Sequence, residues 1–146
     1  MEGPKEVLQK ILQETKDHRP VAFCVVVETS GSTPQGPGAM MMVDSNSHTV
    51  GTIGGGCVEA SVRRRAFEII QSKTSELVQI DLNNETASEE GLICGGTMKV
   101  AIVFLARDQW YDELANAIAL LEDGKTAEIG INIDANLRYK LRLESE

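Results

Sequence analysis

The chain has 146 residues, of which 42% are hydrophobic and 25% charged, and its formal net charge is −8. This length suits one domain with a single core that needs no disulfides. The acidic balance argues against broad binding to nucleic acids or anionic membranes, because both require a basic surface. No apolar run approaches the roughly 20 residues that span a bilayer, and the N-terminal segment lacks the continuous apolar core of a secretory signal. We therefore expect a cytoplasmic protein.

Three cysteines, Cys24, Cys57 and Cys94, are too few and too widely spaced for a disulfide framework or a structural zinc site. At most one internal disulfide could form. Cys24 lies inside a continuous apolar run, so we interpret it as a core residue. Cys57 and Cys94 instead stand beside glycines, where a different role is open.

The first third of the chain predicts a helix, a buried strand and a hairpin. Apolar residues at one-face spacing after Pro4 predict a helix near residues 5–17. Residues 21–28 are apolar and β-branched, which is typical of a strand covered on both faces. Residues 28–38 are rich in glycine and proline and predict a loop. Residues 39–54 then predict a β-hairpin.

The remaining elements complete one α/β domain. We expect a helix at residues 57–72, a strand at 76–82, a polar loop at 83–91, a strand at 98–105, a helix at 109–122 and a terminal hairpin that turns at 134–136. The predicted fold is a single domain with a mixed β-sheet covered by about three helices. The two most apolar strands, 21–28 and 98–105, should be central in the sheet.

Three consecutive glycines, Gly54, Gly55 and Gly56, precede Cys57 at the predicted junction between the hairpin and a helix. A helix N-terminus carries unpaired N–H groups and partial positive charge, so glycines there would let an anion such as phosphate approach the backbone. The same field stabilises a thiolate on Cys57, as nucleophile or metal ligand. Alternatively, the glycines make only a tight turn over a packed cysteine. A dinucleotide fingerprint is disfavoured, because Glu59 stands where it needs glycine or alanine.

Two further segments combine backbone donors with hydroxyls or a thiol. The loop around Gly31, Ser32 and Thr33 could form an anion nest, although most such loops are only turns. The segment Cys94, Gly95, Gly96 and Thr97 repeats the cysteine-glycine combination, with a turn around a buried cysteine as the alternative. Arg63, Arg64 and Arg65 cannot all point one way on a helix, which favours a solvated face over a phosphate or partner contact.

Three segments in this order, "GSTPQGPGAMMMVD", "GTIGGGCVEA" and "CGGTMKV", closely resemble the N-terminal domain of the XdhC/CoxI family. Members of this family are maturation factors for molybdenum hydroxylases such as xanthine dehydrogenase and carbon monoxide dehydrogenase. The resemblance runs from about residue 21 to residue 105. It implies that the chain binds molybdenum cofactor (molybdopterin) as cargo and helps deliver it in sulfurated form. The family cysteine implicated in holding the cofactor falls on Cys57, which makes Cys57 a candidate molybdenum contact.

On this interpretation the chain is a chaperone and not an enzyme. Cys57 would be the thiolate contact, and the cradle for phosphate or pterin would consist of Gly54, Gly55, Gly56, Gly31, Ser32 and Thr33. A role for Cys94, Gly95 and Gly96 as an adjoining wall is our own hypothesis, motivated by their matching context. The expected protein partners are the apo-hydroxylase that receives the cofactor and a cysteine desulfurase that supplies sulfur.

At its C-terminal side the sequence departs from the family pattern. Full-length relatives continue into a Rossmann-like second domain, and this sequence ends at residue 146 without one. We therefore expect one XdhC/CoxI-like domain over residues 1–146, with a homodimer or a separate Rossmann-domain partner as compensation. Two rival functions stay open: a thiol oxidoreductase in which Cys57 and Cys94 cycle through a disulfide, and a non-catalytic interaction subunit.

Overall fold

The computed structural model describes residues 3–82, 95–107 and 110–145. In chain order its elements are α1 (Pro4–Lys16), β1 (Val21–Ser30), β2 (Met40–Asp44), β3 (Thr49–Gly51), α2 (Gly56–Ser72), β4 (Glu76–Asp81), β5 (Thr97–Leu105), α4 (Tyr111–Glu122), β6 (Ala127–Asn132) and β7 (Arg138–Leu143).

Five strands form one sheet in the order β3-β2-β1-β5-β4, and each neighbouring pair is antiparallel. β1 lies in the middle because its first six residues are apolar and buried, which only a strand covered on both faces can achieve. Its register with β5 shifts between Val26 and Glu28, where a bulge marks the end of the apolar stretch. Beyond the bulge β1 continues with polar residues.

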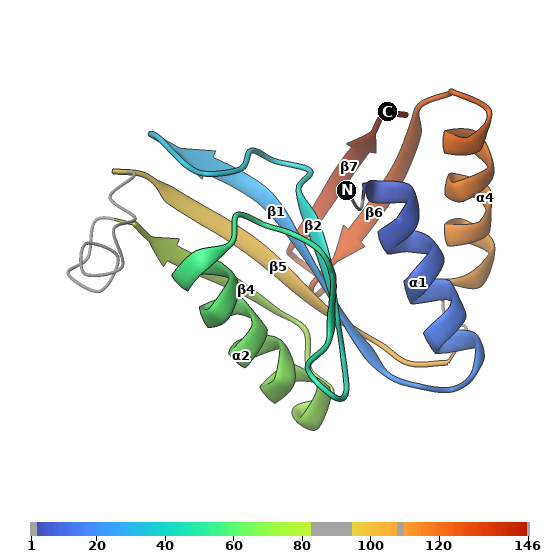
Figure 1. Ribbon diagram of the computed structural model, residues 1–146, viewed down its shortest axis with the longest axis horizontal. Helices are drawn as coiled ribbons and strands as arrows, with labels where there is room; N and C mark the ends of the chain where they lie inside the picture. The colour runs from blue at the N-terminus through green and yellow to red at the C-terminus, as the bar shows by residue number, and fades with distance from the viewer. Residues whose placement is uncertain (1–2, 83–94, 108–109, 146) are drawn as a thin grey trace.

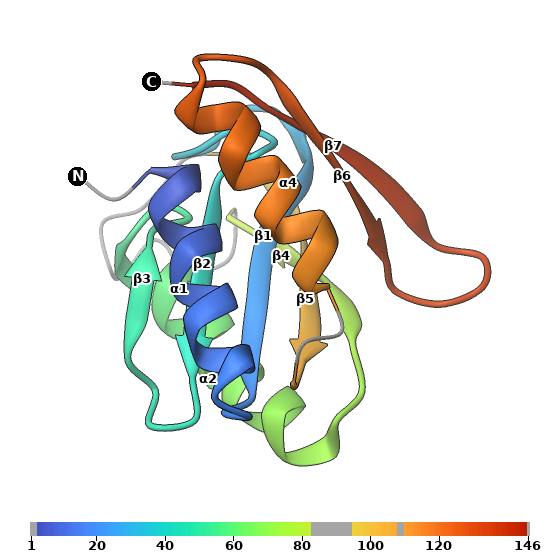
Figure 2. The same cartoon turned by 90° about the vertical axis from the view of Figure 1, so that its right-hand side faces the viewer.

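Helices cover both faces of this sheet (Figure 1). Side chains alternate along β1, so Cys24 joins the apolar cluster beneath α2, while Phe23 joins the cluster beneath α1 and α4. The Phe23 ring meets Trp110 edge to face, with ring centroids 6.4 Å apart. The two-stranded sheet of β6 and β7 extends the side of α1 and α4 and stands out from the body of the molecule (Figure 2).

The structure confirms the α/β class, the three helices and the central position of the two apolar strands. It also confirms the terminal hairpin, whose turn is held by Asp134 Oδ1 accepting from the backbone N–H groups of Asn136 and Leu137 at 2.7 and 2.9 Å. The returning strand of the first hairpin is shorter than residues 49–54, because Gly51 has φ +84° and turns the chain out of the sheet. The expected loop at 83–91 lies outside the described residues.

Within the described ranges, no helix combines the length and apolar character needed to cross a bilayer. The helices instead place apolar stripes against the sheet. In α2 this stripe comprises Val58, Val62, Ala66, Ile69 and Ile70, all of them buried. The same spacing leaves Cys57, near the start of α2, at the border between the buried and exposed faces.

The cluster around Phe23 should carry much of the stability. We expect Phe23→Ala to lower the free energy of unfolding by about 3–5 kcal/mol, since it removes a fully buried ring and leaves a cavity beside Trp110. Phe67→Ala is the matched control: Phe67 is 40% exposed, so its loss should cost less than about 1 kcal/mol. Urea denaturation of both variants checks this, and similar losses for the two would contradict it.

Candidate functional site

The glycine-rich loop after β1 lies directly against the segment that precedes β5. A side chain on Gly96 would place its Cβ only 2.3 Å from the carbonyl oxygen of Ser32 and 2.7 Å from that of Ser30. A Cβ on Gly31 would lie 3.0 Å from the carbonyl oxygen of Gly95. Both approaches join backbone to backbone, so neither can relax by moving a side chain. The structure therefore brings two of the three predicted motifs together.

The same loop also reaches the glycine turn that begins α2. A Cβ on Gly54 would lie 2.8 Å from Cγ of Pro34, so Gly54 packs closely under the proline ring. Pro34 belongs to the loop that contacts Gly95 and Gly96 on its other side. All three motifs thus meet at one end of the sheet, where the loop lies between the other two.

The three glycines before Cys57 each adopt a left-handed backbone, with φ of +138°, +71° and +58° at Gly54, Gly55 and Gly56. Non-glycine residues rarely adopt such angles, so the conformation of the turn alone accounts for the three glycines. A closely approaching ligand is therefore not needed to explain the run of glycines. A Cβ on Gly55 would nevertheless meet no atom within 4 Å, which leaves its backbone open to an approaching group.

A small network of hydrogen bonds holds this turn. Oε2 of Glu59 accepts from the Thr52 hydroxyl at 2.6 Å and from the Gly55 N–H at 3.0 Å, and the Gly54 N–H donates to the Thr52 Oγ1 at 3.2 Å. The carboxylate lies at the N-terminus of α2, where the helix dipole favours negative charge. The network therefore fixes the turn and uses one backbone donor of the helix end.

The first backbone N–H groups of α2 remain available to a ligand. In the described part of the chain, the N–H groups of Gly56, Cys57 and Val58 have no acceptor, as is usual in the first turn of a helix. Cys57 is a free thiol of intermediate exposure beside them. Cys24, by contrast, is fully buried, and this burial raises the pKa of its thiol far above the usual range. Its predicted core role is confirmed, and of these two thiols only that of Cys57 can meet a ligand.

The other predicted site residues differ in what they offer. Ser32 is exposed, whereas the Thr33 hydroxyl donates to the Gln35 carbonyl at 2.9 Å within its own loop. Cys94 lies outside the described residues, so its predicted place in an adjoining wall stays a prediction. The described residues hold no group of three or more His, Cys, Asp or Glu side chains placed to bind a metal ion.

The three arginines of α2 point in different directions, as expected. Arg63 Nε donates to the Ser47 carbonyl at 2.8 Å, and Arg65 pairs with Glu68 and Glu76 at 3.2 and 3.0 Å. All three arginines are exposed. This arrangement agrees with a solvated face.

Two of the residues that shape the turn were not identified from the sequence. Nothing in the sequence around Thr52 predicts its role, because that role depends on a glutamate seven positions later. An acidic residue in the first turn of a helix, such as Glu59, predicts a favourable charge but not a hydrogen bond to Gly55. Pro34 was part of a motif, yet its contact with Gly54 depends on tertiary structure.

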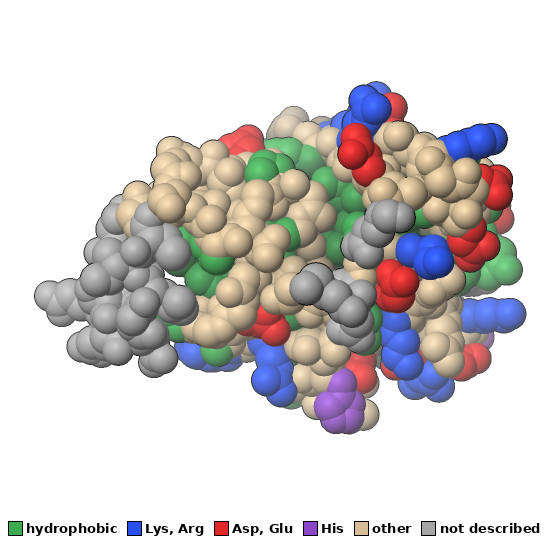
Figure 3. Space-filling model, turned by 45° about the horizontal axis from the view of Figure 1, so that its top comes forward, with side chains coloured by type: hydrophobic (Ala, Val, Ile, Leu, Met, Phe, Trp, Pro, Cys, Tyr) green, Lys and Arg blue, Asp and Glu red, His purple; other side chains and the backbone are tan. Residues whose placement is uncertain are grey.

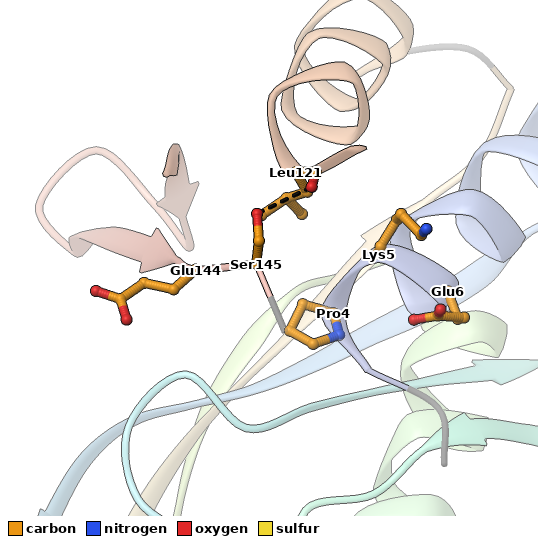
Figure 4. A pocket seen from close by; sticks show the side chains of 6 residues that line it. All are labelled: Pro4, Lys5, Glu6, Leu121, Glu144 and Ser145. Atoms are coloured by element: carbon orange, nitrogen blue, oxygen red, sulfur yellow. Dashed lines mark hydrogen bonds between the residues drawn. The ribbon is translucent and has the colours of Figure 1, made fainter. Parts of the chain in front are cut away.

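The surface over the glycine loops differs from the opposite end of the molecule. In Figure 3 the described part near the ends of β1 and β5 shows mostly backbone, uncharged polar side chains and hydrophobic side chains, while charged side chains gather over α1, α4 and β7. A cavity of about 100 Å³ lies at that charged end, between the start of α1 and the end of α4 (Figure 4). The Ser145 hydroxyl donates to the Leu121 carbonyl there at 2.9 Å. None of the residues that line this cavity belongs to the three motifs.

A comparison with protein families finds a match for the segment that contains two of the three motifs. Residues 15–81 match the model of the XdhC and CoxI family. The match covers a little under half of the chain. The resemblance predicted from the three motifs is therefore confirmed, although the third motif lies beyond the matched residues.

Two individual proteins resemble this chain. YqeB of Escherichia coli strain K12, an uncharacterized protein, is 36% identical over 83 residues, which cover 57% of this chain and 15% of YqeB. A Bacillus halodurans protein described as a xanthine dehydrogenase has a crystal structure that matches with a TM-score of 0.67 at 20% identity, over 90% of this chain and 44% of its own. At this identity the likeness shows the fold alone. This chain spans less than half the length of either relative.

The close approach at Gly96 predicts that even a methyl group disrupts the site. We expect Gly96→Ala to lower the free energy of unfolding by about 2 kcal/mol or more, because its Cβ would overlap two carbonyl oxygens. Gly36→Ala is the control in the neighbouring loop: no atom lies within 4 Å of its Cβ, and its φ is ordinary. That change should leave stability within about 0.5 kcal/mol. Thermal and urea denaturation measure both, and a tolerated Gly96→Ala would contradict the contact.

The difference in burial between Cys57 and Cys24 predicts a difference in reactivity. In the native protein iodoacetamide should label Cys57, while Cys24 should react only after unfolding. Peptide mapping by mass spectrometry separates these sites from Cys94. Equal labelling of Cys24 and Cys57 without denaturant would show that the thiols are not arranged as described.

Proposed function

We propose that this chain binds molybdenum cofactor as cargo and acts as a chaperone in the maturation of a molybdenum hydroxylase. The observation that carries the proposal is the convergence of the three motifs at the start of α2, where the Cys57 thiol stands beside three backbone N–H groups without protein acceptors. The assignment of residues 15–81 to the XdhC and CoxI family supports a maturation-related role.

The residues at this place fit the chemistry of the proposed cargo. The N–H groups of Gly56, Cys57 and Val58 can donate to a phosphate at the positive end of α2. A thiolate is a soft ligand suited to molybdenum or to sulfur transfer, and Cys57 offers one from an accessible position. The open space beside Gly55 lets a group approach the backbone closely. We assign Cys57 to contact with the metal-bearing part and the turn to the phosphate.

The neighbouring segments complete the proposed cradle. Gly31 and Ser32 lie against Gly95 and Gly96, so both segments can border one ligand. Thr33 contributes through its oxygen lone pairs, since its hydrogen is donated within the loop. Cys94 would adjoin this wall through its position next to Gly95 in the chain.

The proposal also names partners and a setting. Cargo delivery requires an apo-hydroxylase as acceptor, and sulfuration requires a cysteine desulfurase as sulfur donor. We place this exchange in the cytoplasm and assign no catalytic step to the chain. We treat the described fold as one domain, working as a homodimer or together with a protein that carries a Rossmann-like domain.

Retention of the cofactor tests this function. After anaerobic incubation with molybdenum cofactor and desalting, the wild-type protein should keep the pterin, measured by the fluorescence of its oxidised form. Cys57→Ala should weaken retention by about tenfold or more, which corresponds to about 1.4 kcal/mol, because it removes the thiolate contact. Cys24→Ala removes a buried thiol instead and should retain the pterin like wild type.

The possible results separate the parts of the proposal. Loss of the pterin from wild-type protein would contradict the chaperone function, whereas full retention by Cys57→Ala would contradict only the thiolate role. The rival thiol oxidoreductase predicts a reversible disulfide between Cys57 and Cys94. Thiol titration against redox buffers detects such a couple, and a potential between roughly −200 and −300 mV would favour that rival.

A further inference from the structure

The β6–β7 hairpin has one open edge. β7 pairs with β6, and at the pair Gly130–Lys140 the Gly130 N–H donates away from β7, to Glu113 Oε1 at 3.1 Å. In an antiparallel ladder the two residues of such a pair both turn their backbone groups outward. The N–H and C=O of Lys140, and by alternation those of Arg142, therefore face the free side of β7. No partner for these groups occurs within the described residues.

A hollow runs along this open edge. It has a volume of about 230 Å³ and is lined by Val27, Pro37 and residues 139–142. Gly38 lies close by, since a Cβ built on it would be 4.0 Å from the Leu141 side chain. The floor of the hollow is thus apolar, and its wall is a strand edge with unpaired backbone groups. Figure 1 shows the loop after β1 passing beside β7.

The outward face of β7 is positively charged although the chain as a whole carries a net charge of −8. Arg138, Lys140 and Arg142 alternate along this face and are exposed. Lys140 is 3.7 Å from Glu128 and Arg142 is 3.9 Å from Glu144, with all four side chains more than half exposed. Such long, solvated pairs neutralise little charge, so the three cations remain available to an acidic partner.

The charge and the apolar hollow determine which kind of strand can bind at the open edge of β7. A second copy of β7 would place like charges opposite each other and is disfavoured. A strand that alternates acidic and apolar residues would instead set its carboxylates beside the cations and its apolar side chains in the hollow, because successive side chains of a strand point to opposite faces.

We propose that the open edge of β7 binds an extended acidic segment of a partner protein, which adds to the β6–β7 hairpin as a third strand. Main-chain hydrogen bonds to Lys140 and Arg142 hold the segment, and the charges set its sequence preference. The loop after β1 joins this place to the proposed cargo site, since Pro37 lines the hollow while Gly31 and Thr33 belong to the proposed cradle.

A labelled peptide, acetyl-Glu-Val-Glu-Val-Glu-Val-Glu-amide, tests the proposal by fluorescence anisotropy at pH 7. Wild-type protein should bind it saturably and more weakly as salt rises. The charge reversal R138E/K140E/R142E should weaken binding by about tenfold or more. Lys140→Pro should have a similar effect, since it removes an N–H of the open edge but no ladder hydrogen bond. Circular dichroism melting verifies that each variant is folded.

Two controls distinguish strand addition from general attraction. The triple variant K16E/K73E/K125E changes three exposed cations elsewhere by the same charge and should bind within about twofold of wild type. The same peptide with both its glutamates and its valines N-methylated has no backbone N–H left to donate to β7, whichever way the strand runs, and should not bind. Absence of wild-type binding, equal weakening by the control triple, or undiminished binding of the methylated peptide would each overturn the proposal.

Discussion

The backbone of Gly96 lies so close to the carbonyl oxygens of Ser30 and Ser32 that no side chain can stand between them, and the candidate site depends on this approach. It extends the pairing of Ser30 with Thr97, the last pair of the β1–β5 ladder. From this point the loop after β1 must cross the end of the sheet, which brings Pro34 onto Gly54 and so reaches the start of α2. The position of the site thus follows from the pairing of the two central strands.

The part of these strands that stabilises the core is distinct from the part that borders the candidate site. Up to the bulge after Val26, β1 is apolar and buried on both sides, and its two faces anchor the two core clusters. Beyond the bulge the core ends, and the chain can expose backbone groups and small side chains without losing buried area. Changes in the glycine loops therefore act on close backbone contacts, whereas changes at Phe23 act on the packing that holds the helices to the sheet.

The elements could be predicted from the sequence because hydrophobic spacing determines them locally: the continuous run at residues 21–26 indicates a doubly covered strand, and the stripe from Val58 to Ile70 indicates a helix. The contacts that build the site could not, since Pro34 with Gly54 and Thr52 with Glu59 depend on how separate segments meet. The proposed cargo comes from the family resemblance, because local chemistry alone leaves the glycine turn undecided between an anion site and a tight turn.

The carboxylate of Glu59 limits how tightly the proposed site can hold an anion. It already lies in the positive field at the start of α2 and accepts the Gly55 N–H, so a phosphate would share that field with a fixed negative charge. The remaining donors, on Gly56, Cys57 and Val58, can still bind the phosphate, but with less electrostatic gain than an uncapped helix end provides. Moderate affinity of this kind suits a carrier, because cargo that must pass to an acceptor enzyme has to be released as well as bound.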